Sequence, residues 1–226
     1  VLVAGEVAPD SPTHQVLRAC RDRLPVAVTD WVPDFESYDR VISDHVEGSA
    51  KVTRWLIEQG ARRIAFLRTE RHGAQWLADR QHGYQQAMRE GGLEPLPPIC
   101  VLNAAGRESR TMGRDGPTAR LIAGYLTDWL LPTRRIDAIV TMSDRHAIDT
   151  GWACRLLGVE PGRDILIAGY DNVWPHCVHN DDKSLLPAIT VEKHRERVAA
   201  EMVDLLRGRI AGKLPTEPQY RVVPHE

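Results

Sequence analysis

The sequence predicts an α/β fold in which helices flank parallel β-sheets. Short apolar runs alternate with longer segments of helical periodicity almost throughout the 226 residues, which is the pattern of successive strand–helix–strand units. Several expected helices stop at a glycine, such as Gly60 and Gly158, shortly before the next strand. The length suffices for one large domain or for two smaller lobes that each have a core.

In the first third of the chain, short strands are separated by helices. The strands are apolar runs, as expected for parallel strands that are buried on both faces. The first helix places Val16, Leu17 and Cys20 on one face, and the second stops at Gly60. Strands are expected at 1–4, 26–28, 41–43 and 64–67, and helices at 12–23 and 47–59.

The remaining two thirds of the chain continue the alternation. A helix begins at the capping pair Ser143–Asp144, of which Asp144 is the favoured cap, and it closes at Gly158. Polar stretches that contain glycine or proline are expected to be loops. Helices are expected at 77–90, 118–131, 144–157 and 195–209, strands at 99–102, 138–141, 165–168, 188–191 and 220–223, and loops at 103–116 and 173–187.

The composition is that of a globular protein with mixed surface charge. Charged residues make up 27% of the chain, the formal net charge is −2, and acidic and basic residues are interspersed. Because nucleic acids are bound through clustered basic side chains, this polypeptide by itself lacks the charge pattern of a DNA- or RNA-binding surface. None of its apolar runs is long enough to span a bilayer.

The four cysteines, Cys20, Cys100, Cys154 and Cys177, are widely spaced and form no CxxC pair. Such spacing is typical of buried thiols in a reducing compartment and argues against a disulfide framework or a zinc site. The chain opens on an apolar run at 1–4, without the segments of a signal peptide. Because a core strand at the very first residue is unusual, we expect the natural protein to continue upstream.

The stretch DILIAGYDN, residues 164–172, is the strongest candidate for a ligand-binding position. A short apolar strand meets Gly169 and delivers Tyr170, Asp171 and Asn172 to its carboxyl end. In open parallel sheets, ligands bind just beyond the carboxyl ends of the strands. Asp171 would there accept a hydrogen bond from a hydroxyl or an amine; the alternative is that it caps the following turn.

Four segments occur in an order typical of one family. VISDHVEGSAKVTRWLIEQGARRIAFL combines a strand, an acidic residue, a glycine-led helix and a basic pair before a second strand. ADRQHGYQQAMREGGLEP contains R-x-x-G-Y, and PAITVEK contains P-x-I-T. IDAIVTMSDRHAIDTGWACRLLGVEPGRDILIAGYDNV contains a D-A-I strand, S-D-x-x-A and G-Y-D-N. Together they resemble the lac-repressor family of transcription regulators, with a match from about residue 1 to 226.

The resemblance implies a periplasmic-binding-protein-like fold of type I, with two Rossmann-like lobes, three crossovers between them and a small-molecule site between the lobes. By this mapping one lobe comprises 1–43 and 192–213, and the other 44–191 and 214–226. It also implies a helix-turn-helix DNA-binding head, and the first strand–helix pairs of the first lobe, that are not part of this chain. A bacterial, cytoplasmic homodimer is implied as well.

The resemblance assigns its principal ligand-binding roles to two residues. Arg80 falls at the family's ligand-clamping arginine, three residues before Gly83. A guanidinium offers five donors in a fixed fork, which suits vicinal hydroxyls, a carboxylate or a purine edge. Asp171 corresponds to the effector-contacting acid, and the two groups on opposite sides of a polyhydroxy ligand would orient it. The alternative for Arg80 is an ordinary solvated helix arginine.

Four further positions are candidates that each have a structural alternative. Trp76, one helical turn before the clamping arginine, would stack on a sugar or a base, or else lie in a core or on the surface of a lobe. Asp30 ends a strand at a ligand position of the first lobe. Ser143 would face the ligand or cap its helix. Lys193, beside a crossover, would favour an anionic ligand or pair with an acid.

The remaining polar and aromatic groups are assigned no binding role. Tryptophans within helices are expected to pack, and loop histidines and acids this widely spaced are more often solvated than metal-binding, so we expect no metal and no cofactor. Arginines in the loop 103–116 are expected to form a solvated lid, with recognition of a phosphate or carboxylate as the alternative. These groups are Trp55, Trp129 and Trp152; His176, His179, Asp181 and Asp182; and Arg107, Arg110 and Arg114.

We therefore expect the effector-binding and dimerisation core of a bacterial lac-repressor-family regulator. Its effector, a sugar or sugar derivative or, second, a nucleobase, would shift the population between two arrangements and so control operator binding by the head. One alternative is an exported sugar-binding protein of a transport system, which shares the fold. Another is an enzyme on a doubly wound sheet, but the chain shows neither a nucleotide loop nor a Ser-His-Asp order.

Overall fold

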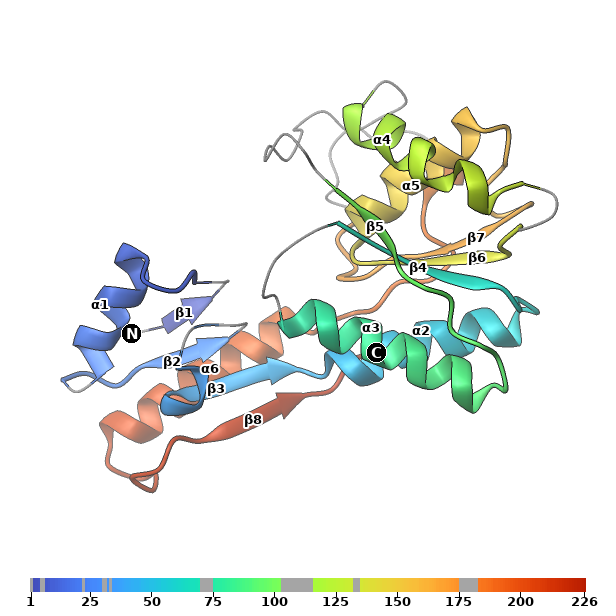
Figure 1. Ribbon diagram of the computed structural model, residues 1–226. Helices are drawn as coiled ribbons and strands as arrows, with labels where there is room; N and C mark the ends of the chain where they lie inside the picture. The colour runs from blue at the N-terminus through green and yellow to red at the C-terminus, as the bar shows by residue number, and fades with distance from the viewer. Residues whose placement is uncertain are drawn as a thin grey trace. The chain divides into compact units, whose positions relative to one another are not determined.

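Two compact units make up the protein, each built on a parallel four-stranded β-sheet with helices on its faces (Figure 1). The predicted α/β class, with parallel sheets flanked by helices, is confirmed. The first unit comprises Val1–His45, Gly73–Ala78 and Lys193–Glu226, and the second Val46–His72 and Asp79–Glu192. The structure is a computed structural model that describes residues 2–4, 7–21, 23–29, 32, 34–69, 75–102, 116–131, 135–174 and 183–226.

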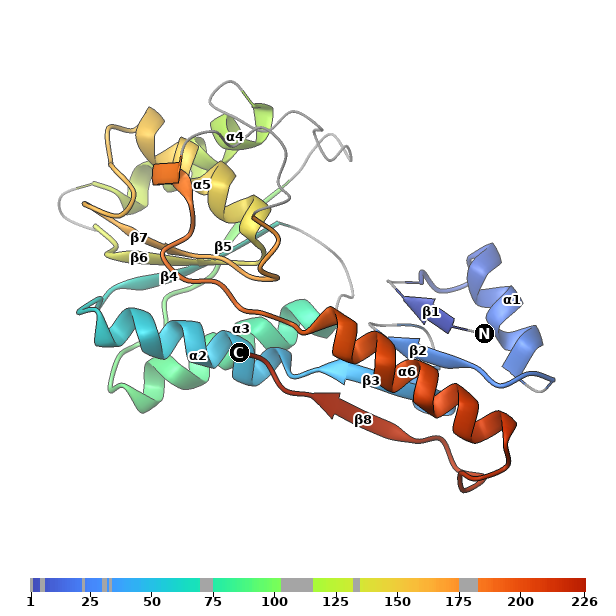
Figure 2. The ribbon, with the colours of Figure 1, turned by 180° about the vertical axis from the view of Figure 1, so that it is seen from behind.

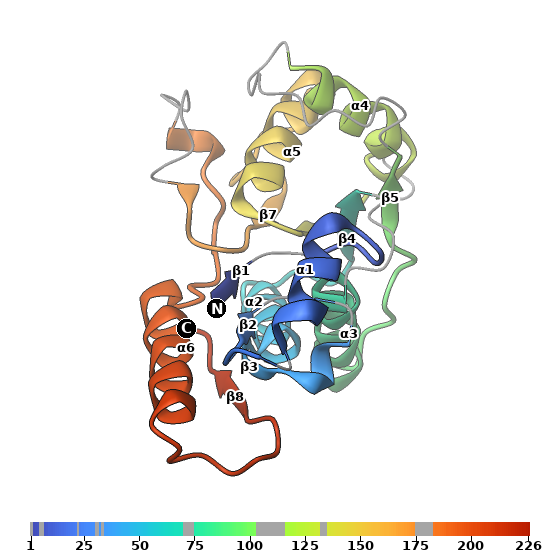
Figure 3. The ribbon, with the colours of Figure 1, turned by 90° about the vertical axis from the view of Figure 1, so that its left-hand side faces the viewer.

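The first sheet has the spatial order β1-β2-β3-β8, with all neighbouring strands parallel. Helices α1 (Pro12–Arg21) and α6 (Arg195–Ile210) lie on opposite faces of it (Figure 3), and α6 runs along β2 and β3 (Figure 2). A short 3-10 turn, η1 (Phe35–Ser37), leads into the third strand. The strands are β1 (Leu2–Ala4), β2 (Ala27–Thr29), β3 (Asp39–Ser43) and β8 (Tyr220–Val223).

The last strand corrects the predicted division of the chain. The sequence places 214–226 in the second lobe, but β8 pairs in parallel with β3, with Val222 opposite Ile42. On the same strand, Val223 packs with Val41 and with Met202 of α6. The prediction is wrong because local patterning indicates that a strand exists, whereas its partner strand depends on long-range packing.

The second sheet has the spatial order β5-β4-β6-β7, again with parallel neighbours. Helices α2 (His45–Glu58) and α3 (Gln75–Glu90) lie on one face, and α4 (Pro117–Leu126) and α5 (Asp144–Leu156) on the other (Figure 1). One 3-10 turn, η2 (Thr127–Trp129), directly follows α4. Another, η4 (Lys183–Leu185), lies shortly before the segment 188–191. The strands are β4 (Ile64–Thr69), β5 (Ile99–Val101), β6 (Ala138–Thr141) and β7 (Leu166–Ala168).

Each face of the second sheet has its own apolar layer. On one face, Phe66 of β4 meets Tyr84 of α3, with ring centroids 5.6 Å apart. The other face packs Ile139 and Ile167 against Ile122 and its neighbours on α4 and against α5. Because both faces are covered, the central strands are continuously apolar, which explains why they are readable from the sequence.

A carboxylate joins the amino ends of β4 and β6. Asp137 Oδ2 accepts hydrogen bonds from the backbone N–H groups of Arg62 and Arg63, at 2.7 and 2.8 Å. The basic pair and the D-A-I strand of the sequence motifs are therefore linked through backbone donors and not through the arginine charges. No helix in the described part of the chain is long and apolar enough to cross a bilayer.

The segment 188–191 is not a regular strand, contrary to expectation. It makes one isolated bridge, between Ile189 and Ala168. Beyond that bridge it accompanies the end of β7, because Gly169 N donates to Ile189 O at 2.8 Å and Asp171 N donates to Val191 O at 3.0 Å. The segment therefore supports the backbone that carries the predicted ligand-binding residues.

Candidate functional site

The loop that follows β7 holds its residues in an unusual backbone conformation. Asp171 and Asn172 have φ angles of 93° and 48°, in the left-handed region that residues other than glycine seldom adopt. Asn172 is tied down twice, because its N–H donates to Thr190 Oγ1 at 3.3 Å and its side-chain amide donates to Glu192 Oε2 at 2.8 Å. Backbone conformations of this kind persist where surrounding bonds enforce them, and they concentrate at functional sites.

A buried carboxylate, Asp144 at the start of α5, organises this loop. Its Oδ2 accepts hydrogen bonds from the N–H groups of Val173 (2.6 Å) and Trp174 (3.0 Å), and its Oδ1 accepts one from the Thr190 hydroxyl. Burial raises the pKa of Asp144 above its ordinary value, although these hydrogen bonds act in the opposite direction. A Cβ at Gly169 would lie 2.2 Å from Asp144 Oδ1, so only glycine allows the loop to approach the carboxylate.

The helix cap is Ser143, which corrects the preference for Asp144. Ser143 Oγ accepts the N–H of His146 at 3.4 Å and lies 2.8 Å from His146 Nδ1. Serine and aspartate are equally good caps, so the sequence offers no basis for the choice. The carboxylate of Asp144 is instead engaged by the loop after β7.

Arg80 of α3 reaches the same loop. The residue is only 3% exposed, so the alternative of a solvated helix arginine is wrong. Its Nη2 donates to Asp171 Oδ1 at 3.2 Å, and its Nη1 donates to the carbonyl oxygen of Met142. The guanidinium carbon lies 3.5 Å from the ring centroid of Tyr170, in a cation–π contact.

The glycine three residues after Arg80 explains how the arginine is positioned. A Cβ at Gly83 would lie 2.0 Å from the carbonyl oxygen of Val46, so α3 approaches the backbone of α2 as closely as glycine permits. Because Arg80 lies one turn before Gly83 on the same rigid helix, this close packing sets the place from which the guanidinium projects. The R-x-x-G spacing therefore has a packing reason.

Arg80 and Asp171 touch one another, whereas the sequence predicts them on opposite sides of a ligand. Both groups belong to the second unit and lie at the carboxyl edge of its sheet, since Met142 follows β6 and Asp171 follows β7. The contact brings a fork of donors and a carboxylate acceptor within 3.2 Å of each other. Such a pair can bind two neighbouring polar groups of one small molecule.

Of the other predicted residues, two belong to the first unit and one belongs to the second. Trp76 and Lys193 belong to the first unit, where the Trp76 ring lies 6.5 Å from that of His45. Ser143 follows Met142, but its hydroxyl is engaged in capping α5. Asp30 lies outside the described residues.

Sequence reasoning assigned no ligand role to two residues that contact the pair or its loop. The ring of Tyr170 lies against the guanidinium of Arg80, and the carboxylate of Asp144 accepts hydrogen bonds from the loop after β7. A signal existed for both, because each lies within a recognised motif, G-Y-D-N and S-D-x-x-A respectively. In neither case does the motif say what the side chain contacts.

The groups of the two predicted loops lie outside the described residues. They are Arg107, Arg110 and Arg114, and His176, His179, Asp181 and Asp182. Among the residues that the structure does describe, no group of three or more histidine, cysteine, aspartate or glutamate side chains is arranged to hold a metal ion.

Comparison with known proteins identifies relatives of the sequence. A family model described as a periplasmic binding protein-like domain matches residues 53–226. The HTH-type transcriptional repressor PurR of Pasteurella multocida (strain Pm70) is 30% identical over 191 residues, which are 84% of this chain and 52% of that protein. PurR of Aliivibrio salmonicida (strain LFI1238) is 25% identical over 197 residues, with the same coverages of 84% and 52%. The chain thus spans about half the length of these curated relatives.

Solved structures share the fold. A regulatory protein of the LacI family from Chloroflexus aggregans matches with a TM-score of 0.75 and 22% identity, over 100% of this chain and 73% of that chain. The transcriptional regulator CelR in complex with cellobiose matches with a TM-score of 0.75 and 24% identity, over 100% of this chain and 63% of that one. At these identities the likeness concerns the fold.

Proposed function

Because the chain belongs to the periplasmic binding protein-like domain family, we propose that it is the effector-binding core of a bacterial transcription regulator of the lac-repressor type. Its small-molecule effector binds at the carboxyl edge of the second sheet. The observation that carries this proposal is the contact at 3.2 Å between the buried Arg80 and the partly buried Asp171, whose loop is held in left-handed backbone conformation.

The chemistry of the pair favours a polyhydroxy ligand. The carboxylate of Asp171 balances the charge of Arg80, so a neutral molecule meets both a donor and an acceptor without adding charge to a buried site. Adjacent hydroxyls of a sugar have this spacing of acceptor and donor. The fold relative CelR is described in complex with cellobiose, which supports a sugar. The proposal extends to Trp76, Asp30 and Lys193, which the resemblance assigns to the effector.

In the proposed regulator the effector acts by binding two arrangements of the core with different affinity, since a ligand with equal affinity for both would shift neither. Operator DNA is bound by a helix-turn-helix head outside this chain, in keeping with the HTH-type relatives. Two heads of a homodimer would read two half-sites of the operator. The protein acts in the cytoplasm, where its DNA is.

An exported sugar-binding protein is the second candidate, since it shares the fold. Both curated relatives described above are transcriptional repressors, and this favours the regulator. Neither candidate is an enzyme.

A thermal-shift and calorimetric screen tests the effector site. The probes are cellobiose, glucose, ribose, adenine and guanine, each added to the 226-residue chain. A ligand that binds only the folded state must raise the melting temperature. The shift should vanish in Arg80→Ala and in the nearly isosteric Asp171→Asn, and it should persist in Arg89→Ala, which removes an exposed arginine from the same helix.

Two results would refute the proposal. One is binding that is as tight in both Arg80→Ala and Asp171→Asn as in the parent, which would move the site elsewhere. The other is a complete absence of binding across the panel, which would contradict the proposal of a sugar or nucleobase effector.

A further inference from the structure

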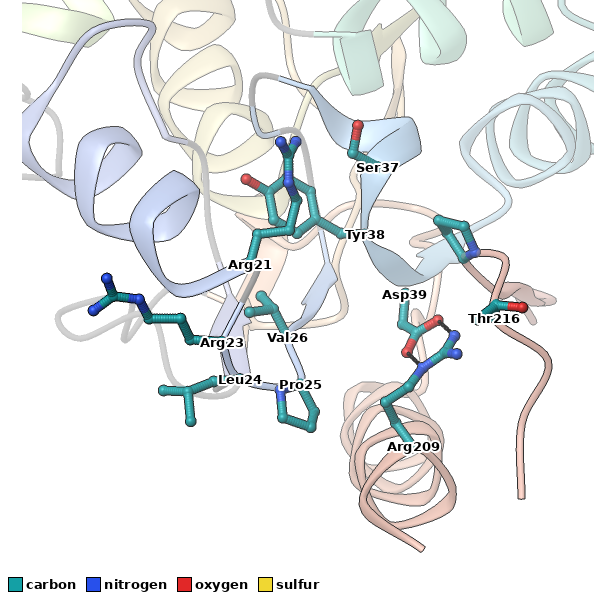
Figure 4. A pocket seen from close by; sticks show the side chains of 11 residues that line it. Arg21, Arg23, Leu24, Pro25, Val26, Ser37, Tyr38, Asp39, Arg209 and Thr216 are labelled. Carbon is teal, nitrogen blue, oxygen red and sulfur yellow. Dashed lines mark hydrogen bonds and ion pairs between the residues drawn. The ribbon is translucent and has the colours of Figure 1, made fainter. Parts of the chain in front are cut away.

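A pocket of about 410 Å³ lies in the first unit, between the end of α1, the start of β3 and the end of α6 (Figure 4). Two of its lining residues, Asp39 and Arg209, are bonded to each other at 2.6 Å. Two others, Arg21 and Arg23, point in different directions (Figure 4). These charged groups therefore do not converge on one ligand, in contrast to the polar groups around the loop after β7 in the second unit.

Three hydrogen bonds tie the loop after β7 to a second segment of the chain. Asp171 N donates to Val191 O at 3.0 Å, and Asn172 N donates to Thr190 Oγ1 at 3.3 Å. The side-chain amide of Asn172 donates to Glu192 Oε2 at 2.8 Å. Three consecutive residues of the second segment therefore each accept one bond from the loop.

The second segment lies where the chain leaves the second unit. Residues 190–192, which we name the crossover segment, end at Glu192, and Lys193 begins the stretch that belongs to the first unit. His194, with a φ angle of 49°, is then the N-cap residue of α6. The loop after β7 thus holds the chain directly before it passes from one unit to the other.

The bond between Asn172 and Glu192 is the one that a substitution can isolate. Of the other two, one joins backbone groups only, and the other uses the Thr190 hydroxyl, which also donates to Asp144. By contrast, the amide of Asn172 and the carboxylate of Glu192 can each be replaced by a group of nearly the same shape. The carboxylate makes the bond charge-assisted, and both residues are half-buried, so water competes for it less than at an open surface.

Asn172 is the direct neighbour of Asp171, the proposed acceptor for the effector. Both residues have left-handed backbone conformation, and a planar peptide unit joins them, so a rotation at one residue turns the other. The carboxylate of Asp171 meets Arg80 through a single bond of 3.2 Å, whereas Asn172 is fixed by two bonds. The place of the Asp171 carboxylate is therefore set from its neighbour.

We propose that Asn172 is a positioning residue of the effector site, which holds Asp171 in place through the bond to Glu192 and couples the loop to the crossover segment. This inference rests on the proposed function, in which Asp171 meets the effector. Effector binding would then order the crossover segment, and by linkage a loosened crossover segment would weaken effector binding by the same factor.

Two single substitutions and their combination test the bond without a ligand. Asn172→Asp keeps the shape and tolerates the left-handed backbone, but it places a second carboxylate against Glu192. Glu192→Gln alone keeps an acceptor for the amide of Asn172. In the double variant Asn172→Asp/Glu192→Gln, donor and acceptor are exchanged, the bond is restored and the net charge equals that of the parent.

Hydrogen–deuterium exchange measures the amide protection of the segments 166–174 and 188–195. Asn172→Asp should lower the protection of both at least about tenfold, because a charge-assisted bond is replaced by the repulsion of two carboxylates. Glu192→Gln should change it less than about threefold, and the double variant should return to within about threefold of the parent. General damage to the second unit would not be repaired by a second substitution at Glu192.

Two controls accompany the exchange measurement. The protection of α4, in the same unit, should be equal in all variants. Gln59→Glu adds one negative charge at an exposed position of the same unit and should leave both segments as protected as in the parent. If Asn172→Asp is unfolded by circular dichroism, Asn172→Gly takes its place, since it loses the amide but adopts a positive φ, and it should lower the protection severalfold.

Calorimetry with cellobiose, glucose, ribose, adenine and guanine measures the effect on the effector site. A probe that binds the parent should bind Asn172→Asp at least about tenfold more weakly and should bind the double variant like the parent. At saturation the same probe should raise the protection of the segment 188–195 in the parent.

The proposal is overturned if Asn172→Asp, or the glycine variant in its place, leaves both segments protected as in the parent. It is equally overturned if the double variant is no better protected than Asn172→Asp, or if Asn172→Asp binds a probe as tightly as the parent. In these cases a probe that binds the parent and is lost in Arg80→Ala still upholds the effector site itself. Absence of binding by every probe refutes the effector site and this coupling together.

Discussion

Two partly buried arginine–aspartate pairs, one in each unit, differ in the number of bonds that join the partners. In the first unit, Arg209 meets Asp39 through two bonds of 2.9 and 2.6 Å, and Asp39 accepts a third bond from a backbone N–H. In the second unit, Arg80 meets Asp171 through a single bond of 3.2 Å. Asp39 starts a regular strand, whereas Asp171 has a φ angle of 93°.

The difference indicates two roles. A two-bond pair with further backbone bonds is hard to open and fastens the loop before β8 to the sheet. A single, longer bond is easier for a ligand to replace, and the loop that carries Asp171 is held by Asp144 and by the segment 188–191 rather than by the arginine. We therefore propose a structural role for the first pair and a ligand-binding role for the second.

The largest expected effect comes from breaking the structural pair. Asp39→Ala leaves Arg209 without its carboxylate partner, so the free energy of unfolding should fall by about 3–5 kcal/mol. Urea denaturation followed by circular dichroism measures it. Asp204→Ala removes one end of a surface ion pair of the same unit, with a side chain that is 70% exposed, and should cost less than about 1 kcal/mol. Equal losses in the two variants would contradict the structural role.

The contrast between satisfied and unsatisfied carboxylates recurs on α5. Asp144 accepts three hydrogen bonds, whereas Asp149 Oδ1 is buried without a partner among the described residues. Burial raises the pKa of Asp149 to about 6, while Arg145 acts in the opposite direction. The protonated form is therefore favoured in the folded state, so the stability that it contributes is present below the ordinary pKa near 3.8 and is lost as the pH rises through about 6.

Asp149→Asn should remove this loss. At pH 7 the variant should be more stable than the parent by up to about 3 kcal/mol, since each unit of pKa shift corresponds to about 1.4 kcal/mol. At pH 4 the unfolding free energies of the two proteins should be nearly equal. Thermal unfolding measures both, under conditions in which it is reversible. If the stability of the parent does not fall relative to that of the variant between pH 4 and pH 7, the carboxylate of Asp149 is not buried without a partner.

A smaller effect is expected from the glycine that positions Arg80. Gly83→Ala would place a Cβ 2.0 Å from the carbonyl oxygen of Val46, so α3 must shift, at a cost of about 1–3 kcal/mol. Gly124→Ala is the control, because a Cβ there meets nothing within 4 Å on an exposed face of α4, and alanine should stabilise the helix by about 0.5–1 kcal/mol. If Gly83→Ala also lowers effector affinity, packing at Gly83 places the arginine.

The smallest stability change is expected at the pair proposed for binding. Asp171→Asn keeps the shape and tolerates the left-handed backbone, and Arg80 retains Met142 O and Tyr170, so the unfolding free energy should change by about 1 kcal/mol or less. Effector affinity should nevertheless fall at least about tenfold, as measured by calorimetry. A stability loss as large as that of Asp39→Ala would show that the two pairs are alike.

Much of the fold was predictable because its signals are local. Apolar runs, helical periodicity and glycine stops lie within windows of a few residues, and the strands β4 and β6 are buried on both faces, so their composition alone marks them. The segment 188–191 was less predictable, because its bonds to the end of β7 are irregular and only one bridge forms.

The candidate site was predictable in its residues but not in its geometry. Arg80 and Asp171 lie in motifs, yet the sequence places them on opposite sides of a ligand, whereas in the structure they touch. The sequence also could not decide between Ser143 and Asp144 as the helix cap. The carboxylate of Asp144 is engaged by a loop about 30 residues later in the chain.

By itself, the sequence determined the α/β class, the order of strands and helices, and the two residues proposed to meet the effector, because periodicity and motif spacing are properties of neighbouring residues. Only the tertiary structure decided that β8 joins the first sheet, that Arg80 and Asp171 form a pair, and that Arg21, Asp39 and Arg209 line one pocket. Those contacts join segments separated by 91 to 180 positions along the chain or by whole elements, and the packing of the complete units is what brings them together.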